Sequence, residues 1–306
     1  MCYNRFMPEL PEVETVARHL QHELHGETIA SITIPWAKWV KADRLKLLQK
    51  ELPEHKLKSV ERRGKYLVFR FTDGSLLLSH LRMTGRWLVD TPQYNVGKHV
   101  SALITFKSGR TAVFHDVRKF GRAAWYHKGE DVPEFDEMGD DPLDPKLTPS
   151  KLYDLFQSRH RELKALLLDQ GFLAGLGNIY VSEILWHARI SPFQRGDELT
   201  KLEVTLFLKM MRHVLKLAIN LRGTTISDFR GPGDWEGGFQ HYLKVYGHQG
   251  EGCPRCGTTI LRAVQGQRAT YFCPHCQHVS KAEANRIAGA HSQRKRAARR
   301  STAAAQ

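Results

Sequence analysis

The sequence has 306 residues, of which 41% are hydrophobic and 25% charged, which is ordinary for a soluble globular protein and leaves room for two domains. Its formal net charge of +14 indicates a polyanionic partner, with nucleic acid as the first candidate. It contains no apolar stretch of membrane-spanning length and no signal-peptide pattern near the start, so we expect a cytoplasmic protein.

The first predicted element is a helix that begins at Pro11 and ends near Gly26. Glu9 and Glu12 lie at its start, where carboxylates complement the helix dipole, and this role alone explains them. Pro8 can act as a nucleophile only if it is the mature N-terminus. Its nitrogen is then a secondary amine with a pKa of about 8. An internal Pro8 is a tertiary amide without nucleophilicity.

Strand patterns dominate from there to about residue 127. They include residues 28–34 and 65–71, a hairpin turn at Asp73-Gly74 before residues 76–78, and a second hairpin that joins residues 102–106 to residues 111–114. The sequence therefore predicts an antiparallel sandwich or barrel behind one N-terminal helix.

The second half has helical periodicity. Proline-rich residues 133–149 are typical of a linker, and helices are expected over residues 151–170, over residues 178–187, and from a capping box at Thr200 and Glu203 to about Gly223. Residues 224–238 are rich in glycine, which indicates either a functional mobile loop or a plain spacer.

Two CxxC pairs, Cys253 with Cys256 and Cys273 with Cys276, are separated by sixteen residues, which fits a four-thiolate structural zinc site. Such a site leaves no open coordination position, so the metal would stabilise the fold and take no part in catalysis. Residues 259–272 between the pairs are predicted to form a hairpin that turns at Gln265-Gly266.

Three further motifs could contact a duplex. Gly175-Leu176-Gly177-Asn178 precedes a helix and could hold a phosphate, although a simple glycine turn explains it as well. Arg62-Arg63-Gly64-Lys65 and the stretch from Asp116 to Gly121 mix basic with aromatic residues, which suits reading bases and filling an opened stack. Each could instead be a solvated loop.

Taken in order, the segments MPELPEVET, RRGKYLVF, HLRMTGRW, GLGNIY, QRATYFC and both CxxC pairs closely resemble bacterial formamidopyrimidine-DNA glycosylases, of the wider group that includes endonuclease VIII. The resemblance runs from Met7 to about His278 and implies an α+β fold with double-stranded, damaged DNA held between two lobes. The implied division is an extension at residues 1–6, a catalytic β-sandwich domain at 7–135, a linker at 136–149, a helix-two-turn-helix domain at 150–240, a zinc finger at 241–278 and a disordered basic tail at 279–306.

The resemblance also implies a role for each matching residue. Pro8 would be the nucleophile, Glu9 the acid/base partner, and Lys65 the lysine near the lesion phosphate. Met83, Arg118 and Phe120 would fill the void left by an extruded base, with Arg118 facing the orphaned cytosine. The remaining implied contacts are Asn178, Arg268 and His99 on the DNA backbone and Glu12 and Glu183 in supporting roles.

The implied activity is that of a monomeric bifunctional glycosylase and AP lyase of base excision repair, which uses a Schiff base and β,δ-elimination and binds one structural Zn2+. Leu10 and the Met83, Arg118 and Phe120 set favour oxidised purines, namely 8-oxoguanine opposite cytosine and formamidopyrimidines. A zinc-ribbon transcription module would leave Pro8 and Glu9 unexplained.

Two departures from the family pattern bear on function. Residues 1–6 precede Met7, so we expect a misassigned start codon. If Pro8 is never freed, the alternative is a catalytically silent protein that binds damaged DNA. The second departure is at Gly97-Lys98-His99, where the family often has a further histidine two places before His99, which weakens the expectation of one phosphate contact.

Overall fold

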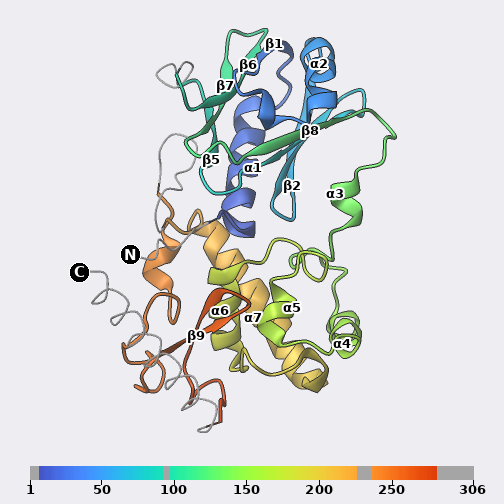
Figure 1. The fold of residues 1–306 in the computed structure, drawn as a ribbon. Coiled ribbons are helices and arrows are strands. Elements are labelled where there is room, and N and C mark those ends of the chain that lie inside the picture. Colours follow the sequence, from blue (N-terminus) through green and yellow to red (C-terminus); the bar gives the residue numbers. More distant parts are fainter. Residues whose placement is uncertain (1–6, 92–96, 226–235, 281–306) are drawn as a thin grey trace, which may run out of the picture. The chain divides into compact units, whose positions relative to one another are not determined.

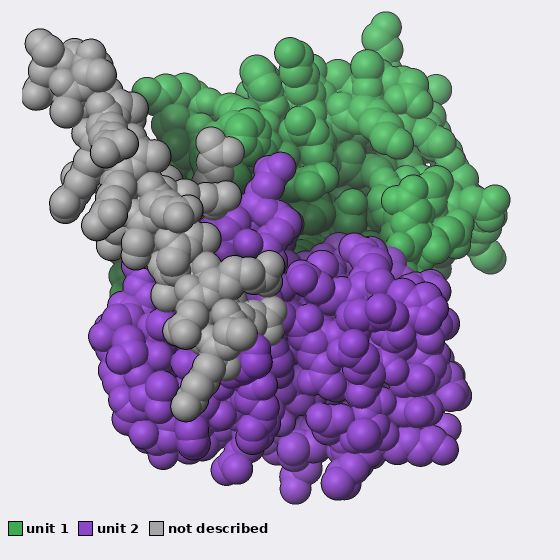
Figure 2. All heavy atoms as spheres, turned by 60° about the horizontal axis from the view of Figure 1, so that its bottom comes forward, with its two compact units in different colours: residues 1–138, 215–242 green, residues 139–214, 243–306 purple. Residues whose placement is uncertain are grey.

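The computed structural model describes residues 7–91, 97–225 and 236–280 (Figure 1). The extension, most of the glycine-rich loop and residues 281–306 of the predicted basic tail therefore lie outside the described residues. Val279, which was predicted to begin the disordered tail, is instead buried against Ala263 and Phe272. Contacts divide the chain into two compact units, coloured separately in Figure 2. Unit 1 holds Met1–Met138 with Leu215–Tyr242, and unit 2 holds Gly139–Val214 with Leu243–Gln306.

Unit 1 is built on two four-stranded antiparallel sheets. The first has the order β1-β6-β7-β5, formed by Ile29–Thr33, Val100–Phe106, Thr111–Asp116 and Gly85–Val89. The second has the order β2-β3-β4-β8, formed by Leu57–Arg63, Tyr66–Phe71, Leu76–His80 and Arg122–Tyr126. Buried aromatic rings connect them, with Phe69 of β3 centred 5.3 Å from Trp87 of β5. The predicted sandwich is confirmed.

Both predicted hairpins are present in the sandwich. The β3–β4 hairpin turns through Gly74, whose φ of +94° is a conformation that glycine adopts without strain. Strands β6 and β7 pair around Ser108 and Gly109. Helix α1 spans Leu10–Leu24 and buries Val13, Val16, Leu20 and Leu24, which recur at helical spacing. Three helical elements were not predicted: α2 (Ala42–Glu51) and the short helices η1 (Ala37–Trp39) and α3 (Pro133–Asp136).

Unit 2 carries helices and one small hairpin (Figure 1). The helical elements are α4 (Pro149–Gln157), α5 (Leu163–Leu167), α6 (Asn178–Ala188) and η3 (Gly196–Glu198), and the hairpin pairs β9 (Leu261–Gln265) with β10 (Arg268–Phe272). The expected single helix over residues 151–170 is wrong. It breaks between α4 and α5, because the backbone there bonds to the chain at the start of η3: Gly196 N–H donates to Arg161 O, and Leu163 N–H donates to Gln194 O.

Helix α7 (Lys201–Asn220) runs from unit 2 into unit 1, and η4 (Phe239–Tyr242) follows in unit 1. The predicted capping box opens α7: Thr200 N–H donates to Glu203 Oε2 over 2.8 Å, and Glu203 N–H donates to Thr200 Oγ1 over 3.2 Å. The domain limits set out above stay a prediction. Among the helices of the described residues, none has the length and apolar content to cross a bilayer.

Candidate functional site

Pro8 is buried and lies directly before Glu9, the N-cap of α1. Glu9 and Glu12 form a capping box, in which Glu9 N–H donates to Glu12 Oε2 over 2.9 Å. Glu9 is only 4% exposed. The helix-capping role considered for these two carboxylates is therefore real, and it restrains Glu9 directly after Pro8 in the chain.

Glu12 has a second partner that lies far away in the sequence. Its Oε1 accepts the backbone N–H of Thr224 over 2.7 Å, so one fully buried carboxylate joins the start of α1 to the segment after α7. Gly223 makes this approach possible, since a Cβ there would lie 2.7 Å from Glu12 Oε1. No local sequence signal identifies Thr224 as a member of the site.

Lys65 occupies the turn between β2 and β3 and is 6% exposed. This turn is held to α1 by Arg62, which donates to Glu14 Oε2 over 2.9 Å and also to Gly64 O. Burial lowers the pKa of the neighbouring His80 to about 3, and the charges of Arg82 and Lys65 add to that effect. Lys65 therefore lies in a positively charged region, on a turn that is held to α1.

The three expected void-filling residues lie on two loops of unit 1. Met83 is half-buried between β4 and β5, while Arg118 and Phe120 follow β7. Phe120 is 45% exposed, and the Arg118 guanidinium carbon lies 4.8 Å from the centre of its ring. An exposed phenyl ring with a cation stacked on it is suited to entering a base stack.

His99 stands at the start of β6, and its ring centre lies 5.5 Å from that of His115. Its backbone O accepts the N–H of Asp116 over 2.8 Å, so His99 borders the same loop as Arg118. Ser101, two positions further on, has a buried hydroxyl without a hydrogen-bond partner in the described structure.

Asn178 and Arg268 are the expected backbone contacts of unit 2. Asn178 is the first residue of α6, after the N-cap Gly177, and its buried Oδ1 has no hydrogen-bond partner among the described residues. Arg268 is exposed at the start of β10. Lys164, which the sequence analysis did not identify, anchors β10 because its Nζ donates to Ala269 O and Thr270 Oγ1.

Glu183 of α6 is fully buried, and its carboxylate accepts three backbone N–H groups. The donors are Lys244, Val245 and Tyr246, over 2.9, 3.0 and 2.8 Å. Burial raises the pKa of Glu183, while the three N–H donors favour the ionised form. This carboxylate therefore fixes the segment that leads into the cysteine-rich module.

The four cysteines converge, with all their Sγ atoms within 4.8 Å of one another. Cys253 and Cys276 are 3.9 Å apart and Cys256 and Cys273 are 3.5 Å apart, with no disulfide among them. Tetrahedral zinc with Zn–S bonds near 2.3 Å requires sulfurs about 3.8 Å apart. The four thiols therefore fit one zinc ion.

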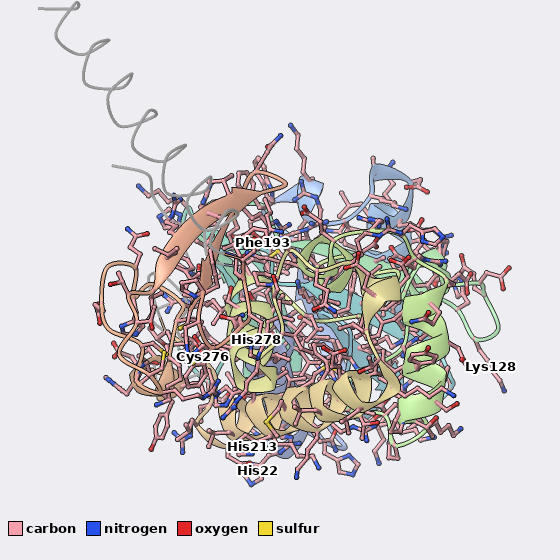
Figure 3. The ribbon with its side chains drawn as sticks, turned by 90° about the horizontal axis from the view of Figure 1, so that it is seen from below. His22, Lys128, Phe193, His213, Cys276 and His278 are labelled. Carbon is pink, nitrogen blue, oxygen red and sulfur yellow. The ribbon has the colours of Figure 1, made fainter. Side chains whose placement is uncertain are left out.

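Two aromatic contacts support this cysteine module. Trp186 of α6 donates its indole N–H to Cys253 Sγ over 3.4 Å, and the Arg255 guanidinium carbon lies 3.9 Å from the centre of the same indole ring. Phe193 packs edge-on against Phe272 of β10, with ring centres 5.1 Å apart. Phe193 and Cys276 are both labelled in Figure 3.

Known proteins match nearly the whole chain. Sequence profiles match for the formamidopyrimidine-DNA glycosylase N-terminal domain at residues 7–123, the formamidopyrimidine-DNA glycosylase H2TH domain at 138–230 and the zinc finger found in FPG and IleRS at 250–279. The formamidopyrimidine-DNA glycosylase of Cytobacillus firmus is 41% identical over 276 residues, which is 89% of this chain and 100% of the relative. That of Chloroflexus aurantiacus is 40% identical over 275 residues, covering 89% and 98%.

Solved structures agree with these sequence matches. A complex between Lactococcus lactis Fpg and DNA containing an abasic site has a TM-score of 0.81 at 35% identity, covering 88% of this chain and 99% of that one. The MutM (Fpg) protein of Thermus thermophilus has a TM-score of 0.79 at 36% identity, covering 89% and 100%.

Proposed function

Because the chain belongs to the formamidopyrimidine-DNA glycosylase family, we propose that it excises oxidised purines from double-stranded DNA and then cleaves the strand as an AP lyase. The observation that carries this proposal is the position of Pro8, buried beside the N-cap Glu9 at the point where the family match begins. We place the protein in the cytoplasm, associated with the nucleoid, where its substrate lies.

Freed as the N-terminal residue, Pro8 is a secondary amine that attacks C1′ of the damaged nucleotide. A bond forms between the proline nitrogen and C1′ as the glycosidic bond breaks, and the proton of the proline N–H passes to the departing base. Glu9 directly follows Pro8 in the chain and is nearly excluded from water, so we assign it to deliver a proton to the ring oxygen O4′ as the C1′–O4′ bond breaks and the sugar opens. The product is an iminium ion.

The positive iminium acidifies C2′–H of the sugar. Loss of that proton expels the 3′ phosphate, and a second elimination expels the 5′ phosphate. The damaged strand is therefore cut on both sides of the lesion sugar from the same covalent adduct. Lys65 is the cation of unit 1 that we assign to the lesion phosphate, because it is held in the turn tied to α1 by Arg62. No metal takes part in these steps.

A damaged base inside a duplex must be extruded before Pro8 can reach its sugar. We assign Met83, Arg118 and Phe120 to the vacated space, with the Arg118 guanidinium facing the orphaned cytosine. The exposed Phe120 ring and the arginine stacked on it support this assignment. His99 borders this loop and is assigned to a nearby phosphate.

Unit 2 contributes backbone contacts. Asn178 at the N-terminus of α6 and Arg268 on the zinc hairpin are assigned to phosphates of the kinked strand, because a helix N-terminus and an arginine both favour anions. The zinc finger binds one Zn2+ through Cys253, Cys256, Cys273 and Cys276. Its role is to hold the hairpin that carries Arg268.

The test is borohydride trapping on a duplex with 8-oxoguanine opposite cytosine, using protein begun at Met1 and protein begun at Met7, with intact masses recorded. We expect a covalent adduct only when the mass shows a free Pro8. Equal trapping by unprocessed protein would make another amine, first of all Lys65, the nucleophile. Lesion binding without any adduct would support the silent damaged-DNA binding protein instead.

The lesion class is tested separately. We expect excision of 8-oxoguanine and formamidopyrimidines to exceed excision of thymine glycol in single-turnover assays. A strong preference for thymine glycol would overturn the assignment to oxidised purines while leaving the glycosylase chemistry in place.

A further inference from the structure

The loop between β4 and β5 that carries Met83 (the Met83 loop) and the loop after β7 that carries Arg118 and Phe120 (the Arg118 loop) are joined by the buried carboxylate of Asp116. Asp116 ends β7 and is 1% exposed. Its Oδ2 accepts the backbone N–H of Gly121 over 2.7 Å, and its Oδ1 accepts that of Arg118 over 3.1 Å. Asp116 therefore closes the loop that presents Arg118 and Phe120.

The same carboxylate reaches the other loop through Thr84, the residue after Met83. The Thr84 hydroxyl donates to Asp116 Oδ1 over 2.5 Å and accepts the Arg118 N–H over 3.1 Å. Asp116, Thr84 and the Arg118 amide thus form one closed set of hydrogen bonds. The two bonds made by the Thr84 hydroxyl cross from one loop to the other and therefore resist their separation.

An apolar contact lies beneath this polar link. The ring of Phe114, on β7, is fully buried. A Cβ added to Gly85 would lie 2.5 Å from this ring, and one added to Gly121 would lie 2.4 Å from it. Both loops therefore contact the ring through a glycine, because a side chain would not fit there. Each loop is thereby fixed against the same rigid aromatic surface.

Both loops also use an unusual backbone conformation beside the expected void-filling residues. Arg82, before Met83, has a φ of +55°, and Lys119, between Arg118 and Phe120, has a φ of +58°. Left-handed backbone at non-glycine residues is costly and persists only where the surroundings enforce it. The Lys119 Nζ donates to Val100 O over 2.8 Å, which is one such restraint.

We propose that Asp116 and Thr84 are positioning residues for base extrusion, and that their hydrogen bonds lock Met83, Arg118 and Phe120 into one preassembled wedge. This inference rests on the proposed function. In this inference the three side chains are already ordered before DNA binds, so binding does not have to overcome the conformational entropy of ordering the two loops.

The test compares Thr84→Val, which removes the hydroxyl at nearly constant size, with Thr84→Ser, which keeps it. Thr33→Val, at an exposed position of strand β1, controls for the substitution itself. Protein begun at Met7 is assayed in single turnover on 8-oxoguanine opposite cytosine and on a preformed abasic site. A 2-aminopurine beside the orphaned cytosine reports wedge insertion by stopped-flow fluorescence.

We expect Thr84→Val to slow 8-oxoguanine excision and the 2-aminopurine signal about tenfold to a hundredfold, as for small displacements of positioned groups. Cleavage at the preformed abasic site should change by less than about threefold, because that substrate has no base to extrude. Thr84→Ser should restore both rates, and Thr33→Val should match wild type.

Two results would overturn the inference. One is a Thr84→Val protein with wild-type excision and wild-type fluorescence kinetics. The other is an equal loss on both substrates, which would mean a general structural defect. If wild-type protein with a free Pro8 forms no adduct even on abasic DNA, the proposed function fails. If wild-type protein is trapped normally and Thr84→Val has wild-type excision kinetics, only the proposed positioning role of Asp116 and Thr84 is refuted.

Discussion

Replacing Glu183 by glutamine should destabilise unit 2 by about 2–4 kcal/mol. The carboxylate now accepts three backbone N–H groups, and hydrogen bonds to charged groups contribute about 1.5–3 kcal/mol each against about 0.5–1.5 kcal/mol for neutral ones. Glutamine weakens all three bonds and turns an NH2 group towards at least one of the donors. The stated loss is smaller than the sum of the bonds because the pocket can relax.

The measurement is native-state hydrogen exchange at the amides of residues 244–246, which are the donors themselves, together with urea unfolding. Glu251→Gln is the matched control. Its carboxylate is 64% exposed and pairs with His248, so we expect a change below about 0.5 kcal/mol. If these amides are protected from hydrogen exchange equally in Glu183→Gln and in wild type, the ionised carboxylate is not what holds the segment, and the prediction is wrong.

Three further predictions concern pH, metal and charge. Burial lowers the pKa of His80 from the ordinary histidine value of 6.5 to about 3, so the unfolded state binds this proton more readily than the native state. The free energy of unfolding should therefore fall as pH drops from about 6.5 towards 3, by at most about 4–5 kcal/mol. His80→Asn should flatten this pH dependence. Cys256→Ser should release zinc at lower chelator concentration in a colorimetric assay and weaken DNA binding, while binding as tight as wild type would show that the hairpin holds without its metal. Deleting residues 281–306 should lower affinity for undamaged duplex and flatten its salt dependence in fluorescence anisotropy titrations, and an altered ranking of lesions would contradict a purely electrostatic role for the tail.

Local chemistry made several elements predictable. Asp73-Gly74 predicts a hairpin because glycine readily adopts the positive φ found there, and Thr200 with Glu203 predicts a helix start because each side chain caps the other's backbone. The zinc site was predictable from spacing, since ligand geometry constrains where four thiolates can lie in a chain.

Other features depend on partners that sequence patterns do not contain. Helix α2 has few buried residues, so its apolar periodicity is weak against the strand signals around it. The predicted helix over residues 151–170 has adequate periodicity, but backbone bonds to residues at the start of η3 break it. The bond between Glu12 and Thr224 joins residues 212 positions apart, and only the folded chain brings them together.

The indole of Trp186 offers an optical consequence. Its N–H lies against a zinc thiolate and its face against a guanidinium, so its emission should change when the metal leaves, without any attached dye. A Trp186→Phe protein would separate this signal from that of the other tryptophans. The chain thus contains a spectroscopic probe on the helix that begins at Asn178, in direct contact with the cysteine module, and metal loss could be followed in real time in an ordinary fluorimeter.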